Sequence, residues 1–149
     1  CRDAVGVGVD ISTEALKIAE ENGQNLKITD RVEWRQGDYL KAFDEEDIFD
    51  GIFSNPPYIP TKDIGGLSRE VKHEPRLALD GGTDGLYFYH LLAKGAAEHL
   101  KPGGFLAVEF GIGQATDILE MFRKSAQYED FEVIKDYGGI ERALYCRKK

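Results

Sequence analysis

Apolar and polar positions along the chain alternate between two patterns, one typical of buried strands and one typical of amphipathic helices. Residues 4–9 are small and β-branched, which predicts a strand that ends at Asp10. Ser12 is a good helix N-cap, and the apolar residues after it repeat at helical spacing, which predicts a helix to about Gly23. Val32–Gln36 has the pattern of a second short strand.

The third strand, Asp47–Ser54, is mostly apolar and stops at Asn55-Pro56-Pro57-Tyr58. Proline has no backbone N–H and cannot continue a central strand, so this end has a physical cause. The next segment, Ile59–Gly85, has no periodicity and is rich in glycine and proline. A loop of this length inside a compact domain is uncommon and usually functional.

The remainder of the chain continues the alternation of helix and strand. The pattern predicts an amphipathic helix over Leu86–Leu100 that Lys101–Gly104 ends, a buried strand over Phe105–Phe110, a helix over Gln114–Lys124, and closing strands over Phe131–Tyr137 and Glu141–Arg147. Such an alternation predicts an α/β fold with a mainly parallel sheet. In these sheets ligands bind beyond the carboxyl ends of the strands, where Asp10, Asp38, residues 55–58 and Glu109–Gly111 are placed.

Composition narrows the class of protein. The 149 residues make one domain, and 42% hydrophobic with 31% charged residues is typical of a globular chain. The net charge of −8 disfavours a phosphate-binding surface, and no apolar run is long enough to cross a membrane. The two cysteines form no disulfide framework, so we expect reduced thiols and a cytoplasmic protein. The three histidines lack the spacing of a metal site.

The most specific chemical signal is the turn Asn55-Pro56-Pro57-Tyr58. Two adjacent prolines make the turn stiff, so the side-chain oxygen of Asn55 and the carbonyl of Pro56 can face one donor group. A planar –NH2 group has two N–H bonds, and two fixed acceptors match it. Tyr58 can then lie over the planar group and exclude water.

Two acidic residues end the first two strands. Asp10 can accept both hydroxyls of a ribose, as acidic residues do at this place in nucleotide-binding α/β folds. The alternative is that Asp10 only stabilises the N-terminus of the helix that follows. Asp38 repeats the arrangement and can accept from the exocyclic amine of a base, although Gly-Asp is also a common turn.

Taken together, these motifs resemble S-adenosylmethionine-dependent methyltransferases that modify planar nitrogens, and within them the HemK-type release factor glutamine methyltransferases. The resemblance covers nearly the whole chain and rests on residues 9–12, 36–38, 54–59, 73–79, 84–86, 109–111 and 136–142. It implies a Rossmann-like fold with a mainly parallel sheet and an antiparallel C-terminal strand. It also implies methylation of the side-chain amide nitrogen of the glutamine in a Gly-Gly-Gln motif of release factors.

The same resemblance implies roles for particular residues. Asn55 and Pro56 would be catalytic, and the substrate would contact them together with Pro57, Tyr58 and Glu74. The residues expected to hold S-adenosylmethionine are Asp10, Asp38, Tyr39 and Asn55. For Glu74, a bond around the turn or to the substrate and a plain surface position stay open as alternatives.

One departure from the family is serious. The family begins its catalytic domain with a strand and a Gly-rich loop, and neither is found in this sequence, since Gly6-Val7-Gly8 lies inside a strand pattern. We therefore expect residues 1–149 to be a catalytic domain that lacks its N-terminal part. The missing strand would lie between the strands at 4–9 and 47–53 and leave both with an open edge. We expect such a fragment to bind the cofactor weakly or not at all.

Two other functions remain as alternatives. The first is methylation of exocyclic amines on nucleic-acid bases, which uses the same Asn-Pro-Pro-Tyr motif but fits the acidic balance and residues 73–79 poorly. The second is a catalytically silent fragment that binds a partner, which the missing Gly-rich loop favours.

The role of Asp10 leads to the first testable prediction. In a protein that carries this chain and the Gly-rich loop, Asp10→Ala should weaken S-adenosylmethionine binding, because the ribose loses a charged acceptor whose bonds contribute roughly 1.5–3 kcal/mol each. Calorimetry measures the affinity, and the glutamine site should be intact. An unchanged affinity would remove Asp10 from the cofactor site.

Overall fold

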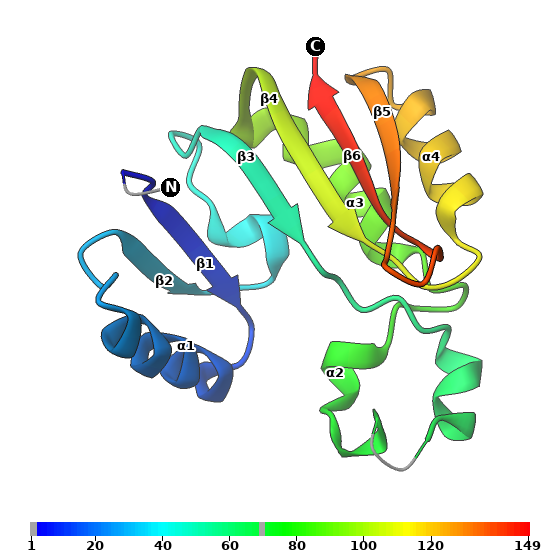
Figure 1. Cartoon of the computed structure of the whole chain (residues 1–149), viewed down its shortest axis with the longest axis horizontal. Coiled ribbons are helices and arrows are strands. Elements are labelled where there is room, and N and C mark those ends of the chain that lie inside the picture. The colour runs from blue at the N-terminus through cyan, green and yellow to red at the C-terminus, as the bar shows by residue number, and fades with distance from the viewer. Residues whose placement is uncertain (1–2, 69–70) are drawn as a thin grey trace. The chain divides into compact units, whose positions relative to one another are not determined.

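The computed structural model describes residues 3–68 and 71–149, and the chain divides into two compact units, residues 1–45 and 46–149 (Figure 1). Cys1 and residues 69–70 of the predicted long loop lie outside the described residues. Within the described part, no helix is long and apolar enough to span a membrane.

The first unit is a β-α-β arrangement. It contains β1 (Gly6–Asp10), α1 (Thr13–Leu26), β2 (Val32–Gln36) and the short 3₁₀ helix η1 (Tyr39–Ala42). The two strands are parallel, and Asp10 pairs with Gln36 at their carboxyl ends. The Ser12 hydroxyl accepts from the N–H of Ala15, 3.2 Å away, which confirms the predicted N-cap.

The helix α1 continues to Leu26, past the glycine at which the sequence pattern predicted its end, and this glycine packs against Trp34. Gly23 is buried, and a Cβ placed on it would lie 3.6 Å from the Trp34 indole nitrogen, so this glycine faces the indole inside the helix. The Trp34 ring also lies across Gly8, where a Cβ would come within 2.4 Å of it. Gly8 is therefore needed for packing within β1.

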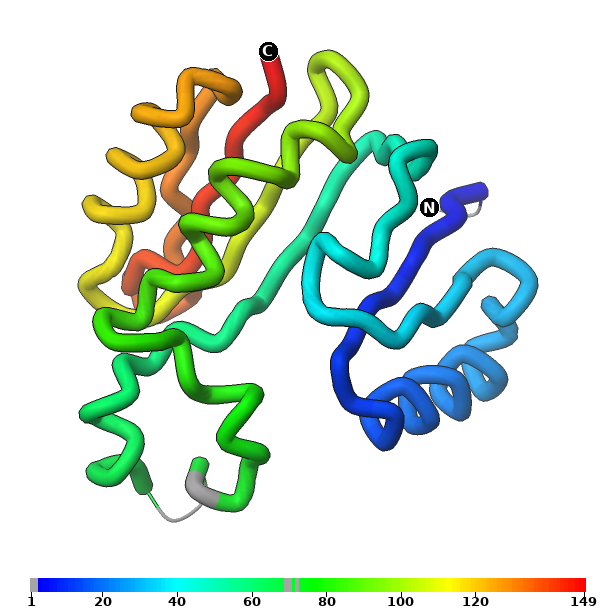
Figure 2. The backbone as a smooth tube through the Cα atoms, turned by 180° about the vertical axis from the view of Figure 1, so that it is seen from behind, coloured from blue at the N-terminus to red at the C-terminus, as the bar shows by residue number. Residues whose placement is uncertain are grey.

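The second unit is a four-stranded sheet in the order β3-β4-β6-β5. Its strands are β3 (Phe49–Ser54), β4 (Leu100–Glu109), β5 (Tyr128–Lys135) and β6 (Glu141–Lys148). The pair β3–β4 is parallel and β6 is antiparallel to both of its neighbours, which confirms the predicted sheet. The helices α3 (Tyr87–Gly95) and α4 (Ala115–Lys124) cover one face of this sheet (Figures 1 and 2).

The apolar faces predicted for the two helices are the ones that the sheet buries. Tyr89 and Ala96 are fully buried, as are Ile118 and Phe122 of α4. The Tyr89 hydroxyl donates to the carbonyl of Glu109 at 2.7 Å, so a buried polar group is satisfied at the carboxyl end of β4.

The boundary between the predicted helix 86–100 and the strand after it is different in the structure. The helix α3 ends at Gly95, a 3₁₀ turn η4 (Ala96–His99) follows, and β4 already begins at Leu100. Lys101–Gly104 form an irregularity inside β4, because the register shifts between the Phe49–Leu100 pair and the Gly51–Phe105 pair. The Gly-Gly pair therefore bends a strand and does not separate two elements.

The sequence predicts the long segment between β3 and α3 as a loop without regular structure, but its described residues, up to 68 and from 71 on, form three short helices. They are η2 (Thr61–Gly66), η3 (Val71–His73) and α2 (Arg76–Leu79). None of them is longer than six residues, so the periodicity was too short to detect.

Among the described residues, four strands have a single paired neighbour, namely β1, β2, β3 and β5. In the part of the chain that the structure describes, β1 pairs only with β2, and β3 pairs only with β4. The expectation that β1 and β3 lack a common neighbouring strand stays a prediction. Strand edges of this kind favour pairing with other chains.

We predict that the isolated 149-residue chain self-associates, because such edges recruit other strands. Phe53 of β3 is 78% exposed, so Phe53→Lys should reduce association by placing a charge on this strand. Sedimentation velocity at several concentrations measures the association. The matched control is Tyr137→Lys, which replaces an exposed aromatic residue outside the strands. A wild-type chain that stays monomeric at all concentrations would contradict the prediction.

Candidate active site

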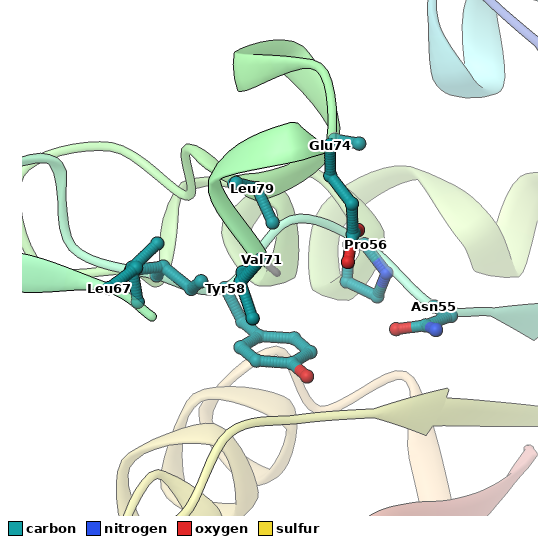
Figure 3. A pocket seen from close by; sticks show the side chains of 9 residues that line it. Asn55, Pro56, Tyr58, Leu67, Val71, Glu74 and Leu79 are labelled. Atoms are coloured by element: carbon teal, nitrogen blue, oxygen red, sulfur yellow. The ribbon is translucent and has the colours of Figure 1, made fainter. Parts of the chain in front are cut away.

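The chain leaves the sheet at Ser54, the last residue of β3, and the next residues line a cavity of about 420 Å³ (Figure 3). Four of the residues that the sequence singled out, Asn55, Pro56, Tyr58 and Glu74, lie around this cavity. Its other lining residues are apolar: Ile59, Leu67, Val71, Ala78 and Leu79. The cavity therefore has a few polar side chains, those of Asn55, Tyr58 and Glu74, beside an apolar wall.

The polar residues reach the cavity from two segments. Asn55 is exposed directly after β3, whereas Pro56 behind it is buried. Figure 3 shows the Tyr58 ring along one side of the cavity and the Glu74 side chain pointing toward Pro56. Glu74 thus lies at the cavity, which favours the alternatives that place it near the turn or the substrate over a plain surface position. Pro57 is absent from the lining.

A short pairing with residues 79–82 holds the segment that follows the two prolines. The N–H of Ile59 donates to the carbonyl of Leu79 at 3.0 Å, and the carbonyl of Ile59 accepts from the N–H of Gly81 at 2.9 Å. The N–H of Thr61 donates to Gly82 at 2.9 Å. The backbone groups beside the cavity are therefore satisfied by hydrogen bonds from a second segment.

Asp80 stabilises this pairing from the side. Its carboxylate accepts from the Thr61 hydroxyl at 2.6 Å, the Gly82 N–H at 3.1 Å and the Arg76 guanidinium at 3.2 Å. The Thr61 hydrogen bond, followed by the Gly82 N–H, lowers the pKa of Asp80 below its ordinary value. Asp80 therefore stays ionised and organises the loop without lining the cavity.

Three glycines allow the loop to approach closely. A Cβ on Gly81 would lie 2.8 Å from the Pro57 carbonyl oxygen, and one on Gly85 would lie 2.4 Å from the Tyr58 carbonyl oxygen. On Gly111, a Cβ would come within 3.0 Å of the Tyr58 ring. Residues 80–85, which end the segment that the sequence predicts as a loop, thus form the surface on which the turn packs.

The predicted cofactor residues Asp10, Asp38 and Tyr39 lie together in the first unit. The N–H of Gly37 donates to the carbonyl of Asp10 at 3.0 Å, which joins the carboxyl ends of β1 and β2. The Asp10 carboxylate accepts from the Ser12 N–H at 2.8 Å, and Asp38 forms an ion pair with Lys41. Tyr39 has a left-handed φ of 62°. Asn55 belongs to the second unit, and its predicted contact with the cofactor stays a prediction.

Sequence reasoning missed Gln114 and the apolar wall. Gln114 follows β4 and bonds the Tyr58 carbonyl across 56 positions of sequence, which a sequence pattern cannot show. Three of the wall residues, Val71, Ala78 and Leu79, lie on helices of three and four residues, which are too short for a periodic signal. Gly111 offered the available hint, because a glycine at a strand end can mark a close backbone approach.

The comparisons with known proteins agree on one class. The family model described as RMKL-like, methyltransferase domain, matches residues 2–63. Curated relatives named release factor glutamine methyltransferase include one from Moorella thermoacetica, 42% identical over 94% of this chain, and one from Bradyrhizobium diazoefficiens, 46% identical over 97% of it. The chain spans about half the length of these relatives, 49% and 48%.

Among solved structures, the crystal structure of a methyltransferase from Pyrococcus furiosus matches 95% of this chain and 61% of its own, with a TM-score of 0.68 and 23% identity. A match at this identity shows a shared fold. It confirms the predicted methyltransferase fold with its mainly parallel sheet and antiparallel C-terminal strand.

The glycine contacts lead to a prediction about the cavity. Gly85 and Gly103 both have a left-handed φ, 79° and 73°, but only Gly85 has neighbours that a Cβ would strike. Gly103→Ala should cost about 1–2 kcal/mol of unfolding free energy from the backbone alone. Gly85→Ala should cost about 1–3 kcal/mol more, because the new Cβ displaces Tyr58.

Urea unfolding measures both losses. Equal losses of stability in the two variants would contradict the close approach at Gly85.

Proposed function

This chain is a homologue of the release factor glutamine methyltransferases along nearly its whole length, and we propose that it carries the catalytic part of an enzyme that methylates a glutamine side chain of peptide chain release factors. The observation that carries the proposal is the cavity after β3. It places the Asn55 side chain and the Pro56 segment beside an apolar wall that suits the arm of a glutamine. Residues 1–149 correspond in this proposal to the catalytic domain without its N-terminal part.

The residues at the carboxyl ends of β1 and β2 fit the nucleoside part of S-adenosylmethionine. Asp10 and Asp38 are carboxylates at the ends of adjacent parallel strands, and such acceptors match ribose hydroxyls and an exocyclic amine. Asp10, Asp38 and Tyr39 would hold the nucleoside, and Asn55 would contribute from the second unit. When bound, S-adenosylmethionine supplies an activated methyl group on its sulfonium.

The protein's main task in this reaction is to orient the amide. An amide nitrogen is a poor nucleophile, because its lone pair is delocalised into the carbonyl group. The side-chain oxygen of Asn55 and the carbonyl oxygen of Pro56 would each accept one N–H of the glutamine amide and fix its plane. Orientation of this kind can lower a barrier by several kcal/mol, up to about 7–11 in well-aligned systems.

The rest of the cavity would bind the glutamine arm and its neighbours. The methylene groups would pack on the apolar wall of Val71 and Leu79, and the Tyr58 ring would cover the amide and exclude water. Glu74, whose side chain reaches the same cavity, would accept a hydrogen bond from the substrate. The prolines keep these groups stiff before binding, so little conformational freedom is lost when the substrate binds.

The partner in this proposal is a protein, the release factor, in the cytoplasm. The net charge of −8 supports a protein substrate over a nucleic acid, because phosphate binding depends on an excess of basic residues.

The test uses the chain alone and a chimera that joins it to the part of the Moorella thermoacetica relative that precedes the matched residues. We expect the chimera to transfer a methyl group from S-adenosylmethionine to a release factor and not to an oligonucleotide. Asn55→Ala should lower kcat on the order of 10²–10³-fold, because one preorganised hydrogen-bonding group is lost. Cofactor affinity should change little, because Asp10, Asp38 and Tyr39 would hold the nucleoside and Asn55 would add one contact to theirs.

The matched control is Asn25→Ala, which removes an exposed amide from α1 and should leave the rate unchanged. Full turnover by the Asn55→Ala variant would remove Asn55 from the catalytic site. Methyl transfer to the oligonucleotide alone would replace the proposed substrate by a nucleic-acid base.

A further inference from the structure

Gln114 occupies a special place in the second unit. It is the N-cap residue of α4 and follows the carboxyl end of β4 after four residues. Its side-chain oxygen accepts from the Gly111 N–H at 2.8 Å, and its amide nitrogen donates to the carbonyls of Tyr58 at 3.0 Å and Gly85 at 3.3 Å. One partly buried side chain thus connects three separate segments.

Only an amide side chain can make these three bonds. Gly111 presents an N–H and requires an acceptor, whereas Tyr58 and Gly85 present carbonyls and require two donors. Glutamine carries one carbonyl oxygen and an –NH2 group with two hydrogens. A carboxylate of the same shape would accept from Gly111 but would face two carbonyl oxygens without a proton to share.

The bond to Tyr58 completes the fixation of one peptide group. The carbonyl of Tyr58 and the N–H of Ile59 belong to the same peptide plane. Gln114 holds the carbonyl end, and the carbonyl of Leu79 holds the N–H end at 3.0 Å. With both ends bonded, the plane cannot rotate without breaking a hydrogen bond.

The same side chain also fixes the surface on which the Tyr58 ring packs. A Cβ on Gly111 would lie 3.0 Å from that ring, and the N–H of Gly111 is bonded to Gln114. The backbone and the ring of Tyr58 are therefore both set from Gln114. Because Pro56 and Pro57 are stiff, the position of Tyr58 is transmitted to the turn that carries the amide acceptors.

We propose that Gln114 is a positioning residue for the amide-binding cavity. It holds Tyr58 in place and, through the two prolines, fixes the positions of the acceptor oxygens of Asn55 and Pro56. Gln114 does not line the cavity and acts through Tyr58. The effect of Gln114 on methyl transfer rests on the proposed function. The three hydrogen bonds by which Gln114 holds Tyr58, Gly85 and Gly111, called the clamp below, are a property of the fold.

Gln127 provides a matched control. Its side-chain nitrogen donates to the carbonyls of Ala93 at 3.1 Å and Lys94 at 3.2 Å. This is also a partly buried glutamine that joins two elements through two carbonyls, but it secures the end of α3 and does not line the cavity. Replacement by methionine preserves the length of either side chain and removes its hydrogen bonds.

The first measurement is amide hydrogen exchange on the 149-residue chain. Gln114→Met should raise the exchange rate at Ile59 and Gly81 by about fivefold, which corresponds to the loss of a net contribution near 1 kcal/mol for a hydrogen bond. Exchange in the β5–β6 ladder should stay as it is. Gln127→Met should leave Ile59 and Gly81 unchanged.

The second measurement is methyl transfer in the chimera described above. Gln114→Met should lower kcat about 10–100-fold, because small misplacements of reacting groups have effects of this size, and should leave the S-adenosylmethionine KM unchanged. Gln127→Met should leave both parameters unchanged. If Gln114 only stabilised the fold, its replacement would not lower kcat selectively while leaving the KM for S-adenosylmethionine unchanged.

Gln114→Glu is the second variant and keeps the shape of the side chain. At neutral pH its carboxylate should disrupt the bonds to the carbonyls of Tyr58 and Gly85, whereas protonation should restore one donor. Slow exchange at Ile59, corrected for the intrinsic pH dependence of amide exchange, should therefore return as the pH is lowered. Unchanged exchange at Ile59 in both Gln114 variants would overturn the clamp. Faster exchange with an unchanged kcat would overturn the positioning role. Faster exchange together with no transfer by the unsubstituted chimera would support the clamp and overturn the proposed function.

Discussion

The site depends on one constraint, which is that two consecutive prolines cannot take part in a sheet. The chain must leave β3 at Asn55, and the peptide groups that follow need hydrogen-bond partners outside the sheet. Residues 79–82 supply partners on one side, and Gln114 supplies one on the other. The stiffness of the prolines would be of little use without these bonds, because a rigid turn attached to a mobile loop has no fixed direction. The cavity is therefore a consequence of how the chain satisfies its backbone after the two prolines.

Close packing of backbone on backbone makes this arrangement possible. Gly81 and Gly85 lie where any side chain would strike the carbonyl oxygens of Pro57 or Tyr58, and Gly111 lies under the tyrosine ring. These glycines come from two regions that are about 30 residues apart, and Gln114 bonds to both regions. The amide acceptors are thus held by main-chain contacts, which position groups more firmly than long side chains do. Such firmness suits a reaction whose main demand is orientation.

Much of this could be predicted from the sequence, and the failures have physical causes. The strand end at Ser54 was predictable because proline acts locally, and the buried faces of α3 and α4 were predictable because their periodicity continues for nine residues or more. The start of β4 at Leu100 was not, because the Gly-Gly pair that signals an end of structure instead bends a strand. The importance of Gln114 was hidden for another reason, since its partner at Tyr58 is distant in sequence. The predicted roles of Asp10 and Glu74 stay predictions, although both residues lie where those roles require.

Two ionised carboxylates, those of Asp80 and Asp136, hold loops in place through the same pattern of hydrogen bonds. Asp80 accepts from the N–H two residues ahead and from Arg76, and Asp136 accepts from the N–H two residues ahead and from Arg142. Hydrogen bonds to the charged form lower the pKa of both, the largest cause being Thr61 for Asp80 and the Ile140 N–H for Asp136. Their stabilisation is present at neutral pH and is lost as the pH falls toward and below the ordinary value near 4. A perturbed carboxyl often marks catalysis, but neither of these lines the cavity, and the proposed acceptors of the glutamine –NH2 group are the side-chain oxygen of Asn55 and the backbone carbonyl of Pro56. A nucleophile that needs alignment more than deprotonation would be served by groups that do not titrate, and the carboxylates would then act by holding the loops that carry them.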